Sequence, residues 1–320
     1  MQCPICNNPI GWERESLYLS QYNDQEYKLN HCTVCHIEFW YPLLMVQGFY
    51  EENKEGLYLD MHSGIRREPT ADHRLFFRYF KEPKGRVLDV GCGDGVFLEK
   101  AGEWAEAYGI DLDAYSVAVA VERRGLKNVY RMNLEQFASF AGSKGLKFDV
   151  VTFFEVLEHQ DNPRRFMGDI RSLLKEGGYI AGSVPNRERL FASVDRTPEF
   201  YGDLPPHHFL WFSADVLRSF LEREGFFKIE IYPVAEIENL IAVLEAWVIR
   251  NSGLWKLRDG LKRSTSNAKP SAVPCGLDSR SYKLLRMIRN LFFFLPAAAL
   301  YPLFRKRKGY QLYFQAQLSR

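Results

Sequence analysis

The chain has 320 residues, of which 46% are hydrophobic and 26% charged, and its formal net charge is +2. These values are typical of a folded globular protein of one or two domains, and they exclude a disordered or collagen-like chain. Six cysteines in a chain of this length also exclude a disulfide scaffold.

Four cysteines form two Cys-x-x-Cys pairs near the N-terminus: Cys3 with Cys6, and Cys32 with Cys35. At this spacing four thiolates can converge on one Zn²⁺, whereas the alternative is four unrelated buried or redox-active cysteines. A closed four-thiolate site leaves no position for substrate, so we predict a structural zinc-ribbon module over residues 1–50, whose zinc can be removed with catalysis intact. His31 and His36 flank the second pair and are expected on the surface.

The segment MQCPICNN has neither the basic nor the apolar region of a secretory signal. Metal-binding cysteines also indicate a reducing compartment, so we expect a cytoplasmic protein. Contact with the inner face of the membrane is compatible with that location.

From about residue 70, short apolar runs alternate with helical patterns. Strands are expected at 86–90, 106–111, 128–132, 148–154, 179–186 and 228–234. Helices are expected at 96–104, 114–125, 134–141, 162–178 and 213–226. This alternation predicts an α/β fold, a parallel sheet with helices on both faces.

A glycine-rich loop, GCGDG, follows the first of these strands and contains Gly91, Gly93 and Gly95. A dinucleotide-binding fingerprint places its third glycine one residue later, where this chain has Val96, so the spacing disfavours a nicotinamide dehydrogenase. Asp111 lies 20 residues after Gly91, at the end of the next strand, where a carboxylate can bind both hydroxyls of a ribose.

Successive segments resemble the motifs of class I S-adenosylmethionine-dependent methyltransferases: VLDVGCGDGVFL, YGIDLD, FDVVTFFEVLEH, LLKEGGYIAGSVPN and HHFLWFSADVLRSFLEREGF. The resemblance covers residues 70–235 and the last ten, about half of the chain. It is strongest to the branch that includes ubiquinone-biosynthesis O-methyltransferases and bacterial surface-glycan methyltransferases.

The resemblance implies a Rossmann-like, seven-stranded sheet whose last strand is antiparallel. The cofactor-binding residues that it implies are Asp89, Gly91, Gly93, Gly95, Asp111 and Asn133. The glycines would line the methionine end of S-adenosylmethionine, Asp89 would lie beneath them, and Asp111 would bind the ribose. Asn133 stands where the family has an adenine-side acid, whose contact an amide can make only in part.

The alternating segment YQLYFQAQL, residues 310–318, predicts the final strand. The methyltransferase domain then comprises residues 51–235 and 310–320, with residues 236–309 as a helical, partly apolar and basic insertion before the last strand. The insertion is expected to contain an apolar helix, EIENLIAVLEAWVIRN, and a loop, KRSTSNAKPSAVPCG. Because it leaves from the carboxyl edge of the sheet, we expect it to cover the substrate side.

Residues 291–304 are apolar and end at a run of four basic residues. As a helix they reach only about 21 Å, short of a hydrocarbon core of about 30 Å, and a span would separate the last strand from its sheet. Pro296 and Pro302 also argue against one straight helix. Two interpretations remain, a packed lid and a surface in peripheral contact with an anionic membrane, and thirteen basic residues against two acids over 256–308 favour the second.

Candidate catalytic residues follow the fourth strand. Glu155, Glu158 and His159 form a Glu-x-x-Glu-His run, expected on one helical turn, and His207 and His208 precede a later helix. Similar runs bind metal in ubiquinone-pathway enzymes and in small-RNA 2′-O-methyltransferases, so one hypothesis places Mg²⁺ or a similar ion on these residues, with either of the two later histidines. Otherwise, the Glu-His pair is structural and His159 or His207 acts as general base.

We therefore expect a methyltransferase that acts on oxygen in a small or lipid-linked acceptor, such as a surface-glycan sugar or a polyprenylated intermediate. An RNA methyltransferase with a zinc-ribbon recognition module is the alternative, but it requires basic surface where residues 1–70 are acidic, so nucleic acid is disfavoured. A non-catalytic scaffold is also disfavoured, because the cofactor motifs are intact.

Overall fold

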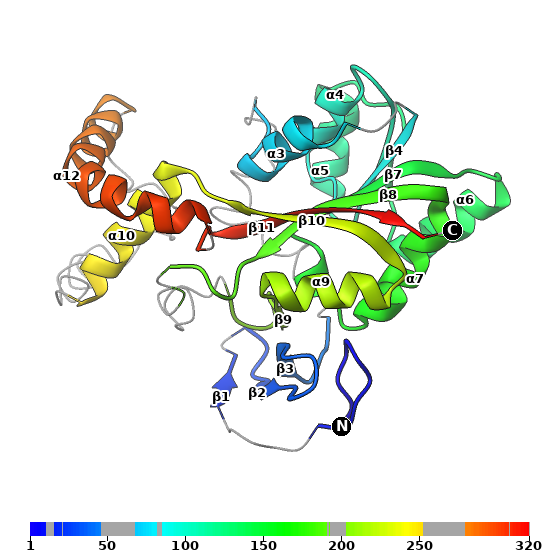
Figure 1. Cartoon of the computed structure of the whole chain (residues 1–320). Coiled ribbons are helices and arrows are strands. Elements are labelled where there is room, and N and C mark those ends of the chain that lie inside the picture. Colours follow the sequence, from blue (N-terminus) through cyan, green and yellow to red (C-terminus); the bar gives the residue numbers. More distant parts are fainter. Residues whose placement is uncertain are drawn as a thin grey trace.

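The computed structural model describes residues 1–10, 16–20, 22–45, 68–81, 85–190, 192, 203–251, 279–306 and 308–319. Two sheets organise these residues (Figure 1). The larger sheet has seven strands in the order β10-β11-β8-β7-β4-β5-β6. In chain order these are β4 (Arg86–Val90), β5 (Glu106–Asp111), β6 (Val129–Arg131), β7 (Phe148–Phe154), β8 (Leu174–Pro185), β10 (Phe226–Val234) and β11 (Gln311–Leu318).

Parallel pairing joins β8, β7, β4, β5 and β6, and β11 lies between β8 and β10, antiparallel to both. Asp89 of β4 is in register with Gly109 of β5 and Thr152 of β7. The predicted seven-stranded sheet with an antiparallel last strand is confirmed. Because parallel strands end at one edge, the loops that follow β4, β5 and β7 meet there.

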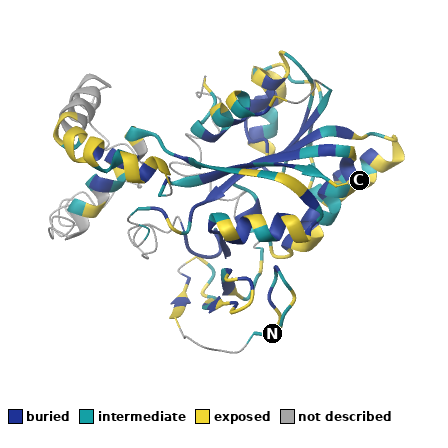
Figure 2. Ribbon diagram, in the orientation of Figure 1, coloured by how far each residue is buried: buried dark blue, intermediate teal, exposed yellow. Residues whose placement is uncertain are grey.

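Helices cover both faces of this sheet (Figure 1). Phe76 and Phe97 come from helices on one face and belong to one buried cluster, whereas Phe137, Phe166 and Phe220 come from the other face and belong to a second. The central strands β4, β7 and β8 are mostly dark blue, that is, buried, in Figure 2, whereas the edge strand β10 is largely teal and yellow. The helices are α3 (Ala71–Tyr79), α4 (Val96–Ala101) and α5 (Ala114–Ala118) on the first face, and α6 (Leu134–Ser143), α7 (Pro163–Leu173) and α9 (Ala214–Arg223) on the second.

Several predicted helix boundaries differ from the structure by a few residues, and two helices differ in kind. The helix predicted to end at Gly178 is α7, which ends at Leu173, because Leu174 adopts an extended conformation (φ −75°, ψ 149°) and begins β8. The helix predicted over 114–125 consists of α5 and a short π-helical segment, η1 (Val119–Arg123).

The cysteine module forms the smaller sheet, in the order β1-β2-β3-β9. Its first three strands are β1 (Ser16–Leu19), β2 (Glu26–His31) and β3 (Glu38–Tyr41), and the fourth is β9 (Leu210–Trp211), which the methyltransferase part of the chain contributes. Phe39 pairs with Leu210, and Trp40 N–H donates to the carbonyl of Phe209 at 2.9 Å. The sheet therefore crosses the domain boundary predicted at residue 50.

The insertion contains two described helices, α10 (Ile237–Asn251) and α12 (Ser279–Lys306), which contact each other beyond the ends of β10 and β11 (Figure 1). The expectation that Pro296 and Pro302 prevent one straight helix agrees with the structure: α12 continues through both prolines, but its ribbon bends. A proline removes one hydrogen bond and displaces the preceding turn, which bends a helix without ending it when neighbours support it.

Among the described helices, none combines the length and the apolar character that crossing a membrane requires. The predicted loop KRSTSNAKPSAVPCG lies outside the described residues, and so do residues 46–67 of the acidic N-terminal part.

Candidate functional site

The glycine loop turns at the carboxyl end of β4 with three residues in the left-handed region. Gly91, Gly93 and Gly95 have φ angles of 75°, 52° and 79°. A Cβ atom on Gly91 would also lie 2.7 Å from Cγ2 of Val156. Only glycine fits here without strain, and such a loop lets a ligand approach the backbone closely.

Asp111, at the end of β5, lies against this loop. Its Oδ2 accepts a hydrogen bond of 2.8 Å from Gly93 N–H, and its Oδ1 accepts one of 2.8 Å from Asp113 N–H. The structure thus joins the predicted ribose-binding carboxylate to the predicted methionine-binding loop. Each carboxylate oxygen has a second lone pair, so these bonds leave acceptor capacity for a ribose.

Asp89 is buried just before the loop. Thr152 Oγ1 donates a hydrogen bond of 2.7 Å to its Oδ1. Burial raises the pKa of Asp89 to about 8, and the nearby carboxylates of Asp111 and Asp72 add to this rise. Ionising all of these neighbouring carboxyl groups together is therefore unfavourable in the ligand-free site. A positively charged ligand would offset this and is favoured.

Asn133 is the N-cap residue of α6, two residues after the end of β6. Its Oδ1 accepts a hydrogen bond of 2.8 Å from Gln136 N–H, and Gln136 Oε1 accepts one of 3.0 Å from Asn133 N–H. This capping box engages the side-chain oxygen with the helix start. The adenine contact of Asn133 stays a prediction.

The histidines predicted from the two distant motifs come together. His159 ends the 3₁₀ turn η2 (Leu157–His159) after β7, and His207 and His208 precede β9. One ligand atom of each of the three rings lies within 4.8 Å of those of the others. Glu158 joins them, since its Oε1 lies 3.8 Å from His159 Nε2 and 3.8 Å from His208 Nε2.

Hydrogen bonds orient two of these rings. The Nδ1 of His159 contacts the carbonyl oxygen of His207. The Nδ1 of His208 lies 3.1 Å from Oδ1 of Asp203, whose Oδ2 accepts a bond of 2.9 Å from Arg189. When Nδ1 carries the proton in each ring, both Nε2 atoms offer a lone pair next to Glu158, the arrangement by which proteins prepare imidazole metal ligands.

The carboxyl group of Glu158 is fully buried, and neither of its oxygens has a hydrogen-bond partner. Burial raises its pKa well above the usual range, and the charge of Glu155 adds to this. Burial lowers the pKa of His159 to about 3 and that of His207 well below its usual value. Neutral imidazoles beside an unsatisfied buried carboxyl fit a divalent cation, which needs deprotonated ligands.

Glu155 does not lie on a helical turn with Glu158 and His159, and that expectation is wrong. Its φ is 54°, and the 3₁₀ turn begins only at Leu157. Burial, with the charge of Asp72, raises the pKa of Glu155 to about 8, and hydrogen bonds with Gln311 and Ser183 oppose the rise. Those partners direct this carboxyl group toward β8 and β11.

Three buried residues of the site escaped the sequence reasoning: Asp72, Arg189 and Asp203. Asp72 accepts a hydrogen bond of 2.7 Å from Ser183 Oγ, across 111 positions of sequence. Asp203 occurs five residues before His208, a spacing that could have marked it as an orienting carboxylate. No comparable local signal identifies Asp72 or Arg189.

The four predicted zinc ligands also converge. Sγ of Cys3 lies 3.5 Å from Sγ of Cys35, and Sγ of Cys6 lies 3.6 Å from Sγ of Cys32. All four are free thiols whose sulfur atoms lie within 4.8 Å of one another. Four thiolates on Zn²⁺ at about 2.3 Å stand about 3.8 Å apart, so this cluster fits the ion. Among the described residues His31 and His36 lie outside the group.

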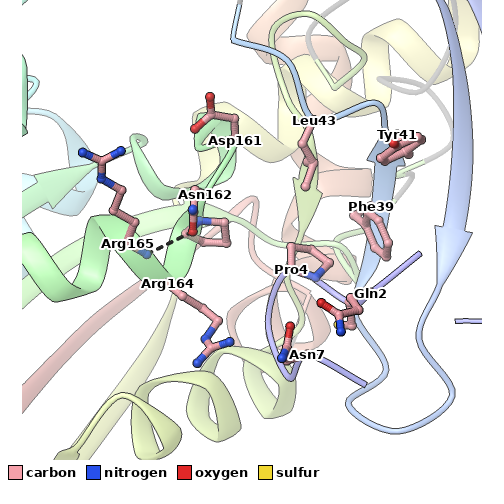
Figure 3. A pocket seen from close by; sticks show the side chains of 12 residues that line it. Gln2, Pro4, Asn7, Phe39, Tyr41, Leu43, Asp161, Asn162, Arg164 and Arg165 are labelled. Atoms are coloured by element: carbon pink, nitrogen blue, oxygen red, sulfur yellow. Dashed lines mark hydrogen bonds between the residues drawn. The ribbon is translucent and has the colours of Figure 1, made fainter. Parts of the chain in front are cut away.

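A cavity of about 500 Å³ lies between the cysteine module and the start of α7 (Figure 3). Phe39 and Tyr41 line it from the module, and Asp161 and Asn162 line it from the loop before α7. Of the predicted site residues only Cys3 lines this cavity. It is therefore separate from the glycine loop and the histidines.

Comparison with known proteins gives one family match. A family described as "Methyltransferase domain" matches residues 61–231. A ubiquinone biosynthesis O-methyltransferase of Paraburkholderia phytofirmans is 36% identical over 104 residues, which cover 32% of this chain and 44% of that protein. One of Glaesserella parasuis is 38% identical over 108 residues, 32% of this chain and 46% of that protein.

This chain thus spans less than half the length of these curated relatives. A crystal structure of an Archaeoglobus fulgidus protein described as a SAM-dependent methyltransferase has a TM-score of 0.46 and 22% identity. The comparison covers 77% of this chain and 91% of that one.

Proposed function

Because this chain belongs to the methyltransferase domain family, we propose that it transfers the methyl group of S-adenosylmethionine to an oxygen atom. The acceptor is a small or lipid-linked molecule, such as a surface-glycan sugar or a polyprenylated intermediate. The observation that carries this proposal is the grouping of Glu158, His159, His207 and His208 at the sheet edge that also carries the glycine loop.

The donor site is the loop of Gly91, Gly93 and Gly95 with Asp111. S-Adenosylmethionine carries a positively charged sulfonium and an ammonium group, so the surplus of buried carboxyl groups around Asp89 favours it over a neutral or anionic ligand. Asp111 binds the ribose hydroxyls, and the backbone of the loop approaches the methionine end.

Glu158, His159 and His208 would hold a divalent ion, with His207 beside it. Mg²⁺ prefers oxygen ligands, whereas two imidazoles and a carboxylate suit Zn²⁺, Mn²⁺ or Fe²⁺, so we revise the expected ion to a transition metal. When bound, such an ion lowers the pKa of the acceptor hydroxyl.

The methyl group moves by in-line displacement, and the acceptor must lose a proton. His207 is neutral because burial lowers its pKa, so it can accept this proton, but it is a weak base. The unsatisfied buried carboxyl group of Glu158 beside two neutral imidazoles favours a bound ion at this site over general-base catalysis alone. Asp203 and the His207 carbonyl keep His208 and His159 in the tautomers that this site needs.

Two further observations support the acceptor class. The ubiquinone-pathway relatives are named as O-methyltransferases, which favours oxygen. The apolar helix α12 lies at the same sheet edge as the candidate site, which favours an acceptor that is lipid-linked (Figure 1). We also propose that Cys3, Cys6, Cys32 and Cys35 bind a structural Zn²⁺.

The test combines binding and turnover. Calorimetry should detect S-adenosylmethionine binding to the wild type, and Asp111→Ala should weaken it by about tenfold or more, since ribose hydrogen bonds are lost. With radiolabelled donor and bacterial extract, label should enter the organic phase, EDTA should abolish this transfer, and His208→Ala should lose bound metal. Asp161→Asn, which changes an exposed acid in the lining of the separate cavity, serves as control.

Absence of donor binding would overturn the assignment as a methyltransferase. Label in RNA would overturn the acceptor class, and transfer that survives EDTA but not His207→Ala would replace the ion by a general base.

A further inference from the structure

One side of α12 packs against α10, and the opposite side is apolar but exposed. Ala297 and Phe304 are fully buried in a small cluster with Leu240, Ile241 and Leu244 of α10. On the other side, Leu291 is 80% exposed, Phe292 73% and Leu295 76%. A helix on the surface of a globular protein usually carries polar residues on the side that faces water.

Helical geometry separates the two sides cleanly. At 100° per residue, the packed residues Phe293, Ala297, Leu300, Tyr301 and Phe304 centre on a direction about 180° from the exposed ones. The exposed residues are Leu291, Phe292, Phe294, Leu295, Pro296, Ala298, Ala299, Pro302 and Leu303. We call these nine residues the outer face of α12; much of it is yellow in Figure 2. It is a contiguous patch, and patches of this kind on a soluble protein mark contact with a partner or a membrane.

The charge of α12 indicates which partner fits. Within Ser279–Lys306 the sequence has six Lys or Arg residues and no Asp or Glu. Arg305 and Lys306, directly after the outer face, are exposed. Apolar side chains flanked by basic residues match a lipid surface with anionic headgroups, in which the apolar groups enter the acyl boundary and the cations stay among the phosphates.

We propose that the outer face of α12 docks the protein on the surface of an anionic phospholipid membrane. The helix lies in the plane of the interface, and α10 holds it from the side of the protein. Because α12 is joined through β11 to the sheet edge beside the candidate site, docking brings that edge near the lipid. The inference deepens the lipid-linked acceptor class of the proposed function, but binding to a membrane requires neither donor nor acceptor.

Flotation of the full chain with vesicles tests this. Vesicles of phosphatidylcholine with about 30% phosphatidylglycerol should carry the wild type upward, and pure phosphatidylcholine should carry much less. Phe292→Ser with Leu295→Ser should reduce binding by about tenfold per side chain, because each loses its transfer from water into the acyl boundary. Arg305→Gln with Lys306→Gln should reduce it by several-fold and weaken its dependence on salt.

The matched control is Leu17→Ser with Leu19→Ser in β1, since these leucines are 56% and 62% exposed but lie in the cysteine module. This control should float like the wild type, and circular dichroism should show equal helix content in all variants.

The proposal is overturned if the wild type does not bind anionic vesicles or if the control loses as much binding as the α12 variant. It is also overturned if sedimentation shows that Phe292→Ser with Leu295→Ser only converts a dimer into a monomer. Any of these outcomes would leave donor binding by calorimetry unaffected, so failure of the docking and failure of the methyltransferase assignment are distinguishable.

Discussion

The candidate site differs from an ordinary hydrophobic core in that several of its buried residues carry carboxyl groups. Asp89 and Glu155 each have a pKa raised to about 8, with burial as the largest cause. Such groups destabilise the ligand-free protein at neutral pH. Ionising them away from water costs free energy, and so does taking up a proton from a solution whose pH is above their usual pKa. The proposed cationic donor and divalent ion would both reduce this cost, which would couple ligand binding to stability.

Glu155→Gln should therefore stabilise the ligand-free protein at high pH. In the unfolded chain the pKa of Glu155 has its usual value of 4.5, and in the folded chain burial raises it to about 8. Below pH 4.5 both states hold the proton and there is no penalty; as pH rises toward 8 the unfolded state is increasingly favoured. The melting temperature of Glu155→Gln should exceed that of the wild type by about 3 °C or more at pH 8, and the gain should vanish near pH 4.5.

Glu176→Gln, at an exposed position of β8, should leave the melting temperature unchanged at both pH values. An equal gain for Glu155→Gln at both pH values would show that packing, and not ionisation, sets the effect.

Among the elements, β9 joins the cysteine module to the candidate catalytic histidines. It adds a fourth strand to the module while directly following the His207-His208 loop. Phe209 N–H donates to the carbonyl of Glu158 at 2.9 Å, and Phe209 O accepts from Trp40 N–H at 2.9 Å. This chain of bonds connects the cysteine site to the histidine site. The expectation that zinc loss leaves catalysis intact stays a prediction, and this pairing argues against it.

Hydrogen exchange can measure that connection without any assay of activity. Removing zinc through Cys32→Ser with Cys35→Ser should speed amide exchange over residues 207–212 by about tenfold or more, because β3 then no longer holds β9. Exchange in β4 and β5 should not change. Cys275→Ser, which removes a thiol outside the two pairs, is the matched control. Unchanged exchange over 207–212 after zinc loss would disprove the coupling.

For the whole molecule, the insertion is a separate packing unit on a continuous sheet. Its buried cluster of Leu240, Ile241, Leu244, Ala297 and Phe304 is distinct from the two clusters that cover the faces of the large sheet. The strands on either side of it are already neighbours: Val234 pairs with Gln311, and Tyr310 N–H donates to the Val234 carbonyl at 3.0 Å. A short turn is enough to connect them.

Replacing residues 237–308 with Asn-Gly should consequently leave the methyltransferase fold and donor binding in place. We expect a cooperative thermal transition and a Kd for S-adenosylmethionine within about threefold of the wild type, while flotation with anionic vesicles is lost. The full-length chain with Phe292→Ser and Leu295→Ser should match it in both assays. Loss of donor binding in the deletion alone would mean that the insertion supports the donor site.

The sequence determined those features that depend on local pattern. Alternating strands and helices, left-handed glycines after β4, and two cysteine pairs each follow from short-range rules of backbone geometry and ligand spacing. Tertiary structure decided how the parts meet: Glu155 lies outside the turn that carries His159, Asp203 orients His208, and β9 completes the sheet of the cysteine module. Among the described residues, the exposed side of α12 also became visible only in the fold, because both of its sides are apolar in sequence and only packing against α10 separates them. Long-range contacts leave no periodic pattern in the sequence, so only the three-dimensional structure shows them.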